Sequence, residues 1–495
     1  MSVKPQYETY RYIGEVCRLH SQSIVECRLS GSEVSSVLAV HAKAVPADCV
    51  CGDGEVNYNG KVELSIVYED GERKICRVER GAEFFHKAEG SAVSPACFAK
   101  AELVAENVSY RREGSGLYIS VVVGAALRVY GGKQVEYFVG GEEIISKAEK
   151  QMLCKTVCVS GETEGDDEFE TEYVGDILLH SENAVVHRVT ASMGQIEVEG
   201  ELNVNICVLR SNDTVCSYER LIPFRMQIPS DEAYGNISAS AQVIVKSAHL
   251  TAGTDEEADK SKMLLAYTLS ADCFLHVKEE IAIASDAFCV ENELQLKRAK
   301  EGGRYLTKHE RYTERVSGTA LLSPTTDGEY LLQASVLPRA EIVCRKGERG
   351  MEAEGAVLAE VLLCSAEGVH RSATLSLPFL FPIDVKEEIV EADCVVCGLN
   401  VRRKKGGETE AEATLKISIR CYEEMSWEYI CEASEGEAFE RNENAFSVFI
   451  PCEGEELWQV AKRLKCPPED LQKSNPDLKF PISAGKRIFV YRKIK

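Results

Sequence analysis

Apolar and polar positions alternate with a period of two through most of the first 440 residues. Leu202, Val204, Ile206 and Val208, for example, are separated by single residues, two of which are asparagines. This period predicts strands that bury one face. Clusters of turn-forming residues, such as 52–54 and 406–407, punctuate the strands. Many short strands between regular turns favour antiparallel sheets in a sandwich or barrel, so we expect a mainly β protein.

Three segments share a glycine followed by an alternating apolar strand. These glycines, at spacings of 140 and 155 residues, are Gly60, Gly200 and Gly355. A phenylalanine follows each glycine after 24 residues, at Phe84, Phe224 and Phe379. A further strand begins 41 residues after the first two glycines and 37 after the third, at Ala101, Ala241 and Ala392. We therefore expect three divergent copies of one module, over residues 1–146, 147–300 and 301–440.

Helical patterns are sparse in these 440 residues. Two short segments near the module junctions, residues 142–152 and 292–300, are the predicted helices.

The pattern changes after residue 440. Residues 446–450 read as a strand, and residues 455–465 place apolar side chains on one helical face. Pro467 and Pro468 end that helix and begin a second one over residues 469–474, because proline is accepted at a first helical position. A closing strand is expected at residues 487–491. Residues 446–495 are thus predicted to form a very small βααβ domain.

This C-terminal segment resembles a LysM domain. The resemblance is carried, in order and at the usual spacing, by residues 452–463 (CEGEELWQVAKR), 471–478 (LQKSNPDL) and 481–488 (PISAGKRI). LysM domains generally bind N-acetylglucosamine-containing glycans such as peptidoglycan, in a shallow groove between two loops. The resemblance maps one side of that groove to Gly454, Glu455, Glu456 and Leu457. It maps the other side to Asn475, Pro476, Asp477, Leu478 and Ile482.

One departure from the family pattern bears on the ligand. The family commonly has Gly-Asp-Thr-Leu where this chain has residues 454–457 (GEEL), so a long carboxylate replaces a small hydroxyl. That carboxylate can accept sugar hydroxyls, can serve a protein contact, or can simply favour the start of a helix through the helix dipole. Trp458 and Leu464 are expected to belong to the domain core.

The first 440 residues resemble a triplicated SPOCS domain, a spore-coat-associated module found with C-terminal LysM domains in clostridial proteins. The resemblance rests on the three modules, their strand pattern and the junction at residues 286–294 (DAFCVENEL). It implies a non-enzymatic spore coat morphogenesis scaffold, made in the mother-cell cytoplasm and recruited to the forespore surface. Its LysM domain would dock to the coat's basement-layer ATPase or another coat protein. Peptidoglycan binding in cell wall or cortex is the alternative, and self-association through strand edges of the repeats is a third possibility.

Charge and composition fit a protein partner for the C-terminal segment. The 495 residues are 44% hydrophobic and 28% charged, with a net charge of −23. Residues 441–495 carry 11 Lys and Arg against 7 Asp and Glu, a net charge of +4, which leaves −27 on the rest. A basic tip on an acidic body suits docking to an acidic surface, and an ordinary charge fluctuation in a small domain explains it equally well. The net charge of −23 makes nucleic acid an improbable partner.

The location expected from the sequence is cytosolic. The first 14 residues lack the apolar core of a signal peptide, and no run of 18 apolar residues predicts a transmembrane segment. We expect most of the 20 cysteines to be reduced and to pack as small hydrophobes.

No motif for catalysis or metal binding stands out. The nine histidines are scattered, and Cys394 and Cys397 lack a second cysteine pair at zinc-binding spacing. His180 and His187 are a weak candidate pair. We find neither a phosphate-binding loop nor a nucleophile elbow. The sequence therefore predicts no catalytic residues, no metal and no cofactor.

Overall fold

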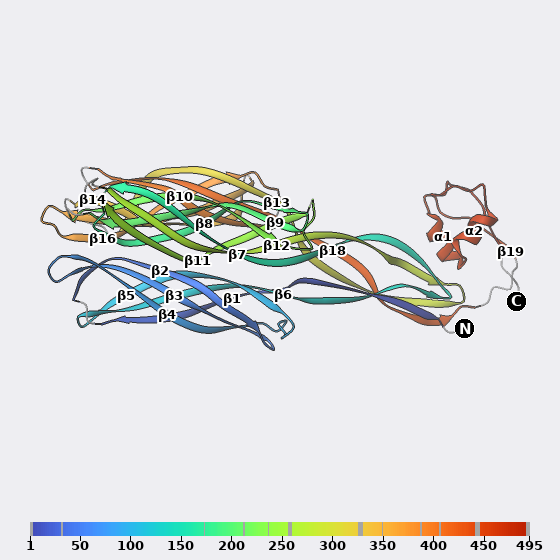
Figure 1. Cartoon of the computed structure of the whole chain (residues 1–495). Coiled ribbons are helices and arrows are strands. Elements are labelled where there is room, and N and C mark those ends of the chain that lie inside the picture. The colour runs from blue at the N-terminus through green and yellow to red at the C-terminus, as the bar shows by residue number, and fades with distance from the viewer. Residues whose placement is uncertain are drawn as a thin grey trace.

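The computed structural model describes residues 3–30, 33–172, 174–210, 213–235, 237–255, 260–324, 330–348, 350–386, 389–404, 407–440 and 446–491. Antiparallel strands dominate, as the alternating pattern predicts. Figure 1 shows an elongated body of packed sheets, a narrow extension at one end, and a small helical unit beside the tip of that extension.

The body contains three successive six-strand units. The first has β1 (Lys4–Leu29), β2 (Val34–Cys51), β3 (Glu55–Asp70), β4 (Ile75–Glu89), β5 (Phe98–Glu113) and β6 (Gly116–Glu142). The second has β7 (Ile144–Glu172), β8 (Asp176–Ser192), β9 (Gln195–Leu209), β10 (Val215–Pro229), β11 (Ser238–Asp255) and β12 (Lys260–Cys289). The third has β13 (Asn292–Ser323), β14 (Tyr330–Gly347), β15 (Gly350–Ser365), β16 (His370–Ile383), β17 (Ile389–Arg403) and β18 (Thr409–Ala438).

Each unit has the same strand order. Its first, sixth and fifth strands form one sheet, with the sixth strand central, and its second, third and fourth strands form another. In every unit the fifth strand lies beside the second strand. The first strand lies beside the fourth strand in the first and third units, and close to it in the second unit. Each unit is therefore a flattened and nearly closed barrel. In the third unit β13 pairs with β16 and joins the two sheets. The inward faces form a separate apolar core in each unit.

The repeated glycines and phenylalanines face each other in every unit. Gly60 pairs with Phe84, Gly200 with Phe224, and Gly355 with Phe379. A Cβ atom on Gly200 would lie 2.2 Å from the Val185 carbonyl oxygen and 2.4 Å from the Phe224 ring. The glycine is therefore needed because the aromatic ring lies across the strand, with no room for a side chain beneath it.

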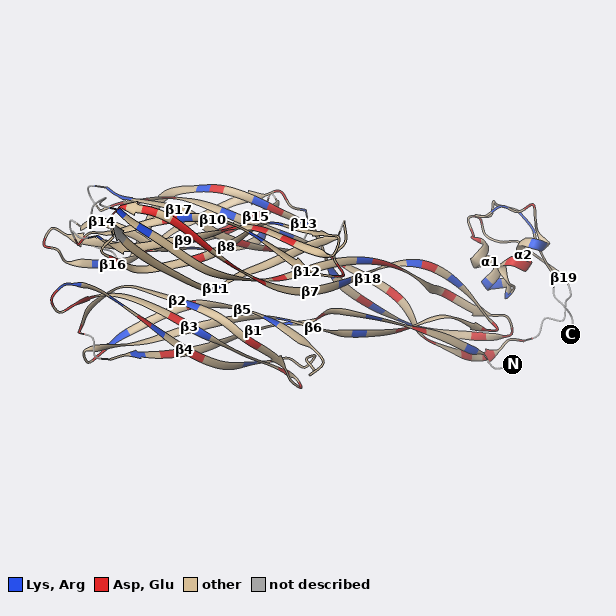
Figure 2. Cartoon of the chain, viewed as in Figure 1, with Lys and Arg blue, Asp and Glu red and all other residues tan. Residues whose placement is uncertain are grey.

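The outer strands of each unit continue past the sheets as two-stranded ribbons. We call these ribbons the stalk; it comprises residues 4–13 with 132–142, 144–155 with 277–289, and 292–305 with 423–438. The ribbons contact one another in a closed ring, β1 with β7, β12 with β13, and β18 with β6. Side chains from all three ribbons meet inside it, among them Tyr137, Leu153 and Trp427. Figure 2 shows basic and acidic residues distributed along these strands.

The prediction of two helices in the body is wrong. Residues 142–152 span the turn from β6 to β7 and the first part of β7, and residues 292–300 begin β13. Both segments are rich in Glu, Lys and other good helix formers, but pairing with β12 and with β18 overrides that preference. Leu294 and Leu296, half-buried between exposed neighbours, keep the two-residue period of a strand.

The C-terminal unit comprises β19 (Phe446–Phe449), α1 (Leu457–Leu464), α2 (Pro468–Ser474) and β20 (Ile488–Tyr491). Glu456 and Gln459 form a capping box at the start of α1, and Lys465 ends the helix in a left-handed conformation. Both helices differ from their predicted bounds by no more than two residues. Within the described residues, no helix combines the length and apolar character needed to cross a membrane.

The glycine and phenylalanine pairs generate a stability prediction. Gly200→Ala forces a Cβ against a carbonyl oxygen and a ring, so unfolding should become easier by about 1–3 kcal/mol. Gly132→Ala is the matched control, because Gly132 also lies in a strand but has no atom within 4 Å of the point where a Cβ would lie. Urea unfolding followed by circular dichroism measures both. Equal stability of the two variants would contradict the proposed role of the glycine.

Candidate functional site

The C-terminal unit is attached to the tip of the stalk through α1. The Trp458 indole N–H donates a hydrogen bond of 2.8 Å to Asp286 Oδ2, and Lys462 Nζ donates one of 2.6 Å to Asp286 Oδ1. The Trp458 ring meets the Phe288 ring edge-on, with centroids 5.3 Å apart. Phe288 and Ile145, which pair across the ribbon, extend the core of the C-terminal unit into the stalk.

Local backbone geometry brings these groups together. Trp458 and Lys462 are four residues apart on α1 and therefore lie on the same helical face. A register shift between Ala284 and Asp286 interrupts β12 just before the contact, and such irregularities change the direction of the following side chains.

Asp286 is held as a carboxylate. Burial alone would raise its pKa, but the hydrogen bonds from Lys462 and Trp458 outweigh burial and lower the pKa below its ordinary value of 3.8. Arg298 Nη2 of β13 lies 4.0 Å from the same carboxylate and adds positive charge. The attachment is therefore a charge-assisted contact with an aromatic pair beside it.

The two predicted groove loops lie side by side. The Gly454 N–H donates to the Ile482 carbonyl oxygen at 2.8 Å, and the Ile482 N–H donates to the Glu455 carbonyl oxygen at 2.9 Å. Gly454, Glu456, Pro476 and Asp477 are exposed. Glu455, Leu457 and Leu478 are half-buried.

Two of the predicted groove residues have their side chains inside the unit. Ile482 is 2% exposed and belongs to the core. The Asn475 side chain donates to the carbonyl oxygens of Leu471 and Phe489 and accepts from the Phe489 N–H, at 2.7–2.9 Å. Asn475 therefore fastens α2 to β20, and the surface open to a ligand consists of the remaining groove residues.

The two glutamates of the first loop also have local roles. Glu455 accepts a hydrogen bond of 2.9 Å from the Cys452 N–H and forms an ion pair with Arg463. Glu456 caps α1. The two residues expected in the core, Trp458 and Leu464, are both partly buried and pack against the core of the C-terminal unit. Trp458 also contacts the stalk.

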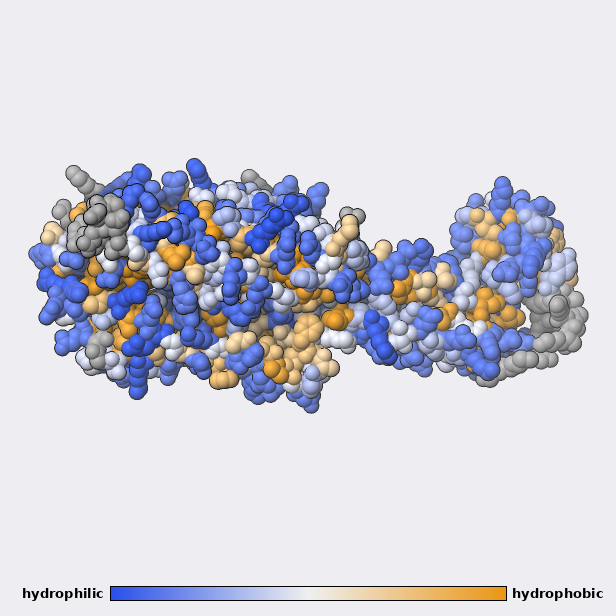
Figure 3. All heavy atoms as spheres, viewed as in Figure 1, coloured by the Kyte–Doolittle hydropathy of each residue, from blue (hydrophilic) through white to orange (hydrophobic). Residues whose placement is uncertain are grey.

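A second exposed surface, which the sequence reasoning missed, lies on the two-stranded sheet. Large apolar side chains on β19, on β20 and just after β19 are 40–62% exposed, namely Phe446, Val448, Ile450, Phe489 and Tyr491. The rings of Phe446 and Phe489 stack with centroids 5.8 Å apart. The alternation along residues 446–450 could have identified this face. Figure 3 shows hydrophobic residues on the C-terminal unit and on the neighbouring stalk.

The candidate metal ligands do not converge. Among the described residues, no group of three or more His, Cys, Asp or Glu side chains is placed to hold a metal ion. His180 is hydrogen-bonded to Glu182, and His187 Nε2 lies 3.1 Å from Glu201 Oε2. Cys394 and Cys397 are free thiols, as are the other cysteines, and burial raises the pKa of Cys394 to about 12.

Comparison with protein-family models, with curated proteins and with solved structures finds no match to this chain. The functional interpretation therefore depends on the residues and their geometry.

The attachment at Asp286 can be tested through tryptophan accessibility. Asp286→Ala removes hydrogen bonds to a charged group, which costs about 1.5 kcal/mol and should lower the equilibrium constant for docking roughly tenfold. Acrylamide should then quench Trp458 more strongly, while Trp427, 5% exposed inside the stalk, stays protected. Glu280→Ala, which removes an exposed carboxylate from the same strand, should leave quenching unchanged. Equal quenching in all three proteins would refute the contact.

The same contact should depend on pH. A lowered pKa means that Asp286 stabilises docking above its ordinary pKa of 3.8, and that this contribution is lost as the pH falls through the lower value in the docked state. Acrylamide quenching of Trp458 should therefore rise on acidification below 3.8, with circular dichroism recorded in parallel to exclude global unfolding. Asp286→Asn should lack this transition.

Proposed function

We propose that the protein is a non-enzymatic spore coat assembly scaffold whose C-terminal unit docks to a protein of the coat's basement layer on the forespore surface. The unit resembles a LysM domain and the body resembles a triplicated SPOCS domain, as described above. The basement-layer ATPase is the partner that this resemblance favours. Synthesis in the mother-cell cytoplasm belongs to the same proposal.

The observation that carries the proposal is the position of the C-terminal unit at the tip of the stalk. Trp458 and Lys462 bind the stalk on one face of α1, while the exposed groove residues keep their surface available. An extended body that holds a small recognition unit at its far end is the arrangement expected of a scaffold. Figure 1 shows the separation between the unit and the packed sheets.

The chemistry of the tip favours a protein partner. The unit combines the exposed apolar face of β19 and β20 with exposed basic residues such as Lys479, Lys486 and Arg487. Apolar anchors surrounded by charge are typical of protein interfaces, and the basic excess speeds association with an acidic surface.

A glycan of the peptidoglycan type is the second candidate. The exposed carboxylates of Glu456 and Asp477, one on each groove loop, are hydrogen-bond acceptors that could receive sugar hydroxyls. Self-association of the repeats is less favoured by the fold, since neighbouring strands cover most sheet edges within each near-barrel.

A charge reversal in the groove tests the proposal. Asp477→Arg in the full chain should reduce capture of the basement-layer protein roughly tenfold or more, because it removes a hydrogen-bond acceptor and places a longer side chain in the groove, and a lost interface contact costs several kcal/mol. Asp470→Arg is the matched control, an identical change on an exposed residue of α2. Binding is measured with purified partner and, separately, by co-sedimentation with purified peptidoglycan.

Two results would contradict the proposal, one concerning the partner and one concerning the groove. One is retention by peptidoglycan that Asp477→Arg abolishes, with no capture of the coat protein by the wild-type chain. The other is equal capture of the coat protein by both variants, which would place the interface outside the groove.

A further inference from the structure

A cavity of about 40 Å³ lies where the three units meet at the base of the stalk. Its walls include Arg18 and Arg128 of the first unit, His276 of the second, and Arg304 and Tyr422 of the third. A buried water needs roughly 10–15 Å³, so the cavity has room for about three waters or for one small anion. Gly302, which also lines the cavity, is exposed, so the cavity is close to solvent at this point.

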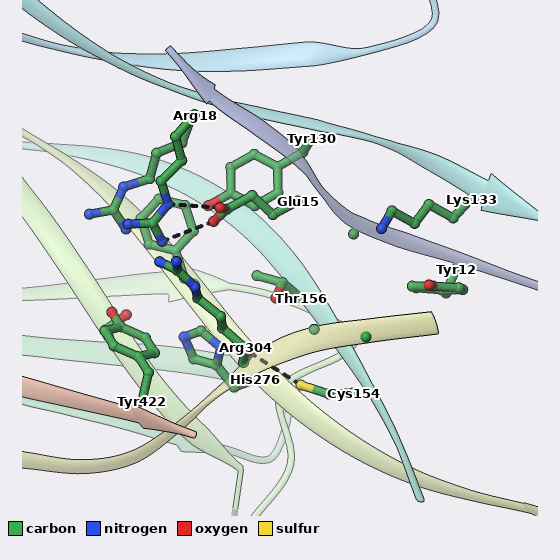
Figure 4. Close-up of a pocket in the computed structure, with 16 residues that line it drawn as sticks. Tyr12, Glu15, Arg18, Tyr130, Lys133, Cys154, Thr156, His276, Arg304 and Tyr422 are labelled. Carbon is green, nitrogen blue, oxygen red and sulfur yellow. Dashed lines mark hydrogen bonds and ion pairs between the residues drawn. The ribbon is translucent and has the colours of Figure 1, made fainter. Parts of the chain in front are cut away.

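The cavity is lined by a surplus of positive charge in a chain whose net charge is −23. Arg18 is paired with Glu15, at 2.7 Å, and with Glu391. Arg128 is paired with Glu391 at 3.0 Å. The Arg304 guanidinium, by contrast, has no hydrogen bond or ion pair with any residue that the structure describes. Figure 4 shows the Arg304 side chain extending past His276 toward Arg18.

His276 is the second group without a side-chain partner. It is 6% exposed, and neither ring nitrogen meets the geometry of a hydrogen bond in the described part of the chain, where the Arg304 backbone acts on the ring only as a weak acceptor. Burial lowers its pKa to about 4, against a weaker opposing effect of the Arg304 backbone, so the ring is neutral at neutral pH. A neutral imidazole has one N–H donor to offer. Buried polar groups normally have hydrogen-bond partners, so an unpaired imidazole points to a ligand in the cavity.

We propose that this cavity binds a small oxyanion of the size and charge of inorganic phosphate. The planar guanidinium of Arg304 supplies paired N–H donors, Arg18 adds positive charge from the other side, and His276 donates its N–H. Because these three residues come from three different units, a bound anion ties the units together where the stalk leaves the body. Binding to the folded state alone stabilises that state.

Calorimetric titration of the full chain with sodium phosphate, at ionic strength held constant with sodium chloride, tests this proposal. We expect saturable binding of one anion per chain and a higher thermal midpoint in phosphate. Arg304→Gln should weaken binding, raising the dissociation constant roughly tenfold or more. Arg315→Gln, the same charge change on an exposed residue of β13, should leave it unaltered.

Several outcomes would overturn the proposal. These are the absence of saturable binding with both phosphate and sulfate, an equal effect of Arg304→Gln and Arg315→Gln, and binding of acetate without binding of phosphate. If Arg304→Gln fails to fold, Arg304→Lys replaces it, since it keeps the charge but loses the guanidinium fork. Weaker binding by Arg304→Lys supports the proposal, and unchanged binding contradicts it.

Discussion

The pairing of the first strand with the sixth strand in each unit is the constraint on which the rest of the molecule depends. In the second unit this pairing runs from Lys260 opposite Glu172 to Cys289 opposite Ile144, almost the full length of both strands. One end of the pair forms a wall of the near-barrel, and the other end forms a ribbon of the stalk. A ribbon of two strands is marginally stable alone. Packing three ribbons around a shared interior, which includes Leu153 and Trp427, removes that weakness.

The same constraint determines where the C-terminal unit is held. Because the second ribbon ends at Cys289, Asp286 and Phe288 lie in the last residues of β12, at the tip of the stalk, where α1 contacts them. The ends of β6 and β18 lack an Asp-x-Phe sequence. The hydrogen bonds and the aromatic contact of α1 are therefore made with one ribbon of the three, and Lys465 adds a contact with Phe439, just after β18. The charged part of this contact is directional, whereas the aromatic part contributes buried apolar area.

The sequence predicts the local features of this fold better than its long-range contacts. The two-residue period predicts the strands, and the repeat of glycine and phenylalanine follows from a cross-strand clash that each pair avoids, as Gly200 and Phe224 illustrate. The period continues through Leu294 and Leu296, but a composition favourable to helices obscured it there. The contact between Asp286 and Trp458 joins residues 172 positions apart, and no local pattern encodes such a pairing. For the groove, the resemblance indicated neighbouring loops without revealing that Asn475 and Ile482 face inward.

The order in which the three units pack requires an explanation beyond apolar burial, because three similar barrels could associate in more than one order. The fifth strands of the three units have different residues at one equivalent position, which is identified by its partner on the sixth strand. These residues are Lys100 opposite Arg128, Ser240 opposite Phe274, and Glu391 opposite Arg420. Each fifth strand makes a contact with the next unit. Lys100 Nζ binds Asp272 at 2.7 Å, and Glu391 binds Arg18 and Arg128. On β11, Ser238, two residues before Ser240, contacts the Tyr305 hydroxyl at 3.0 Å.

Exchanging the first and third units would place Glu391 against Asp272, and Lys100 against Arg420, which is the third unit's equivalent of Arg128. Both replacements bring like charges together in a partly buried setting, where the repulsion is less screened than at the surface. Buried ion pairs add little net stability compared with apolar contacts, but they penalise wrong partners strongly. The charged side chains between the units therefore select one arrangement among several that apolar packing would allow, and that arrangement brings Arg18, His276 and Arg304 to a single cavity.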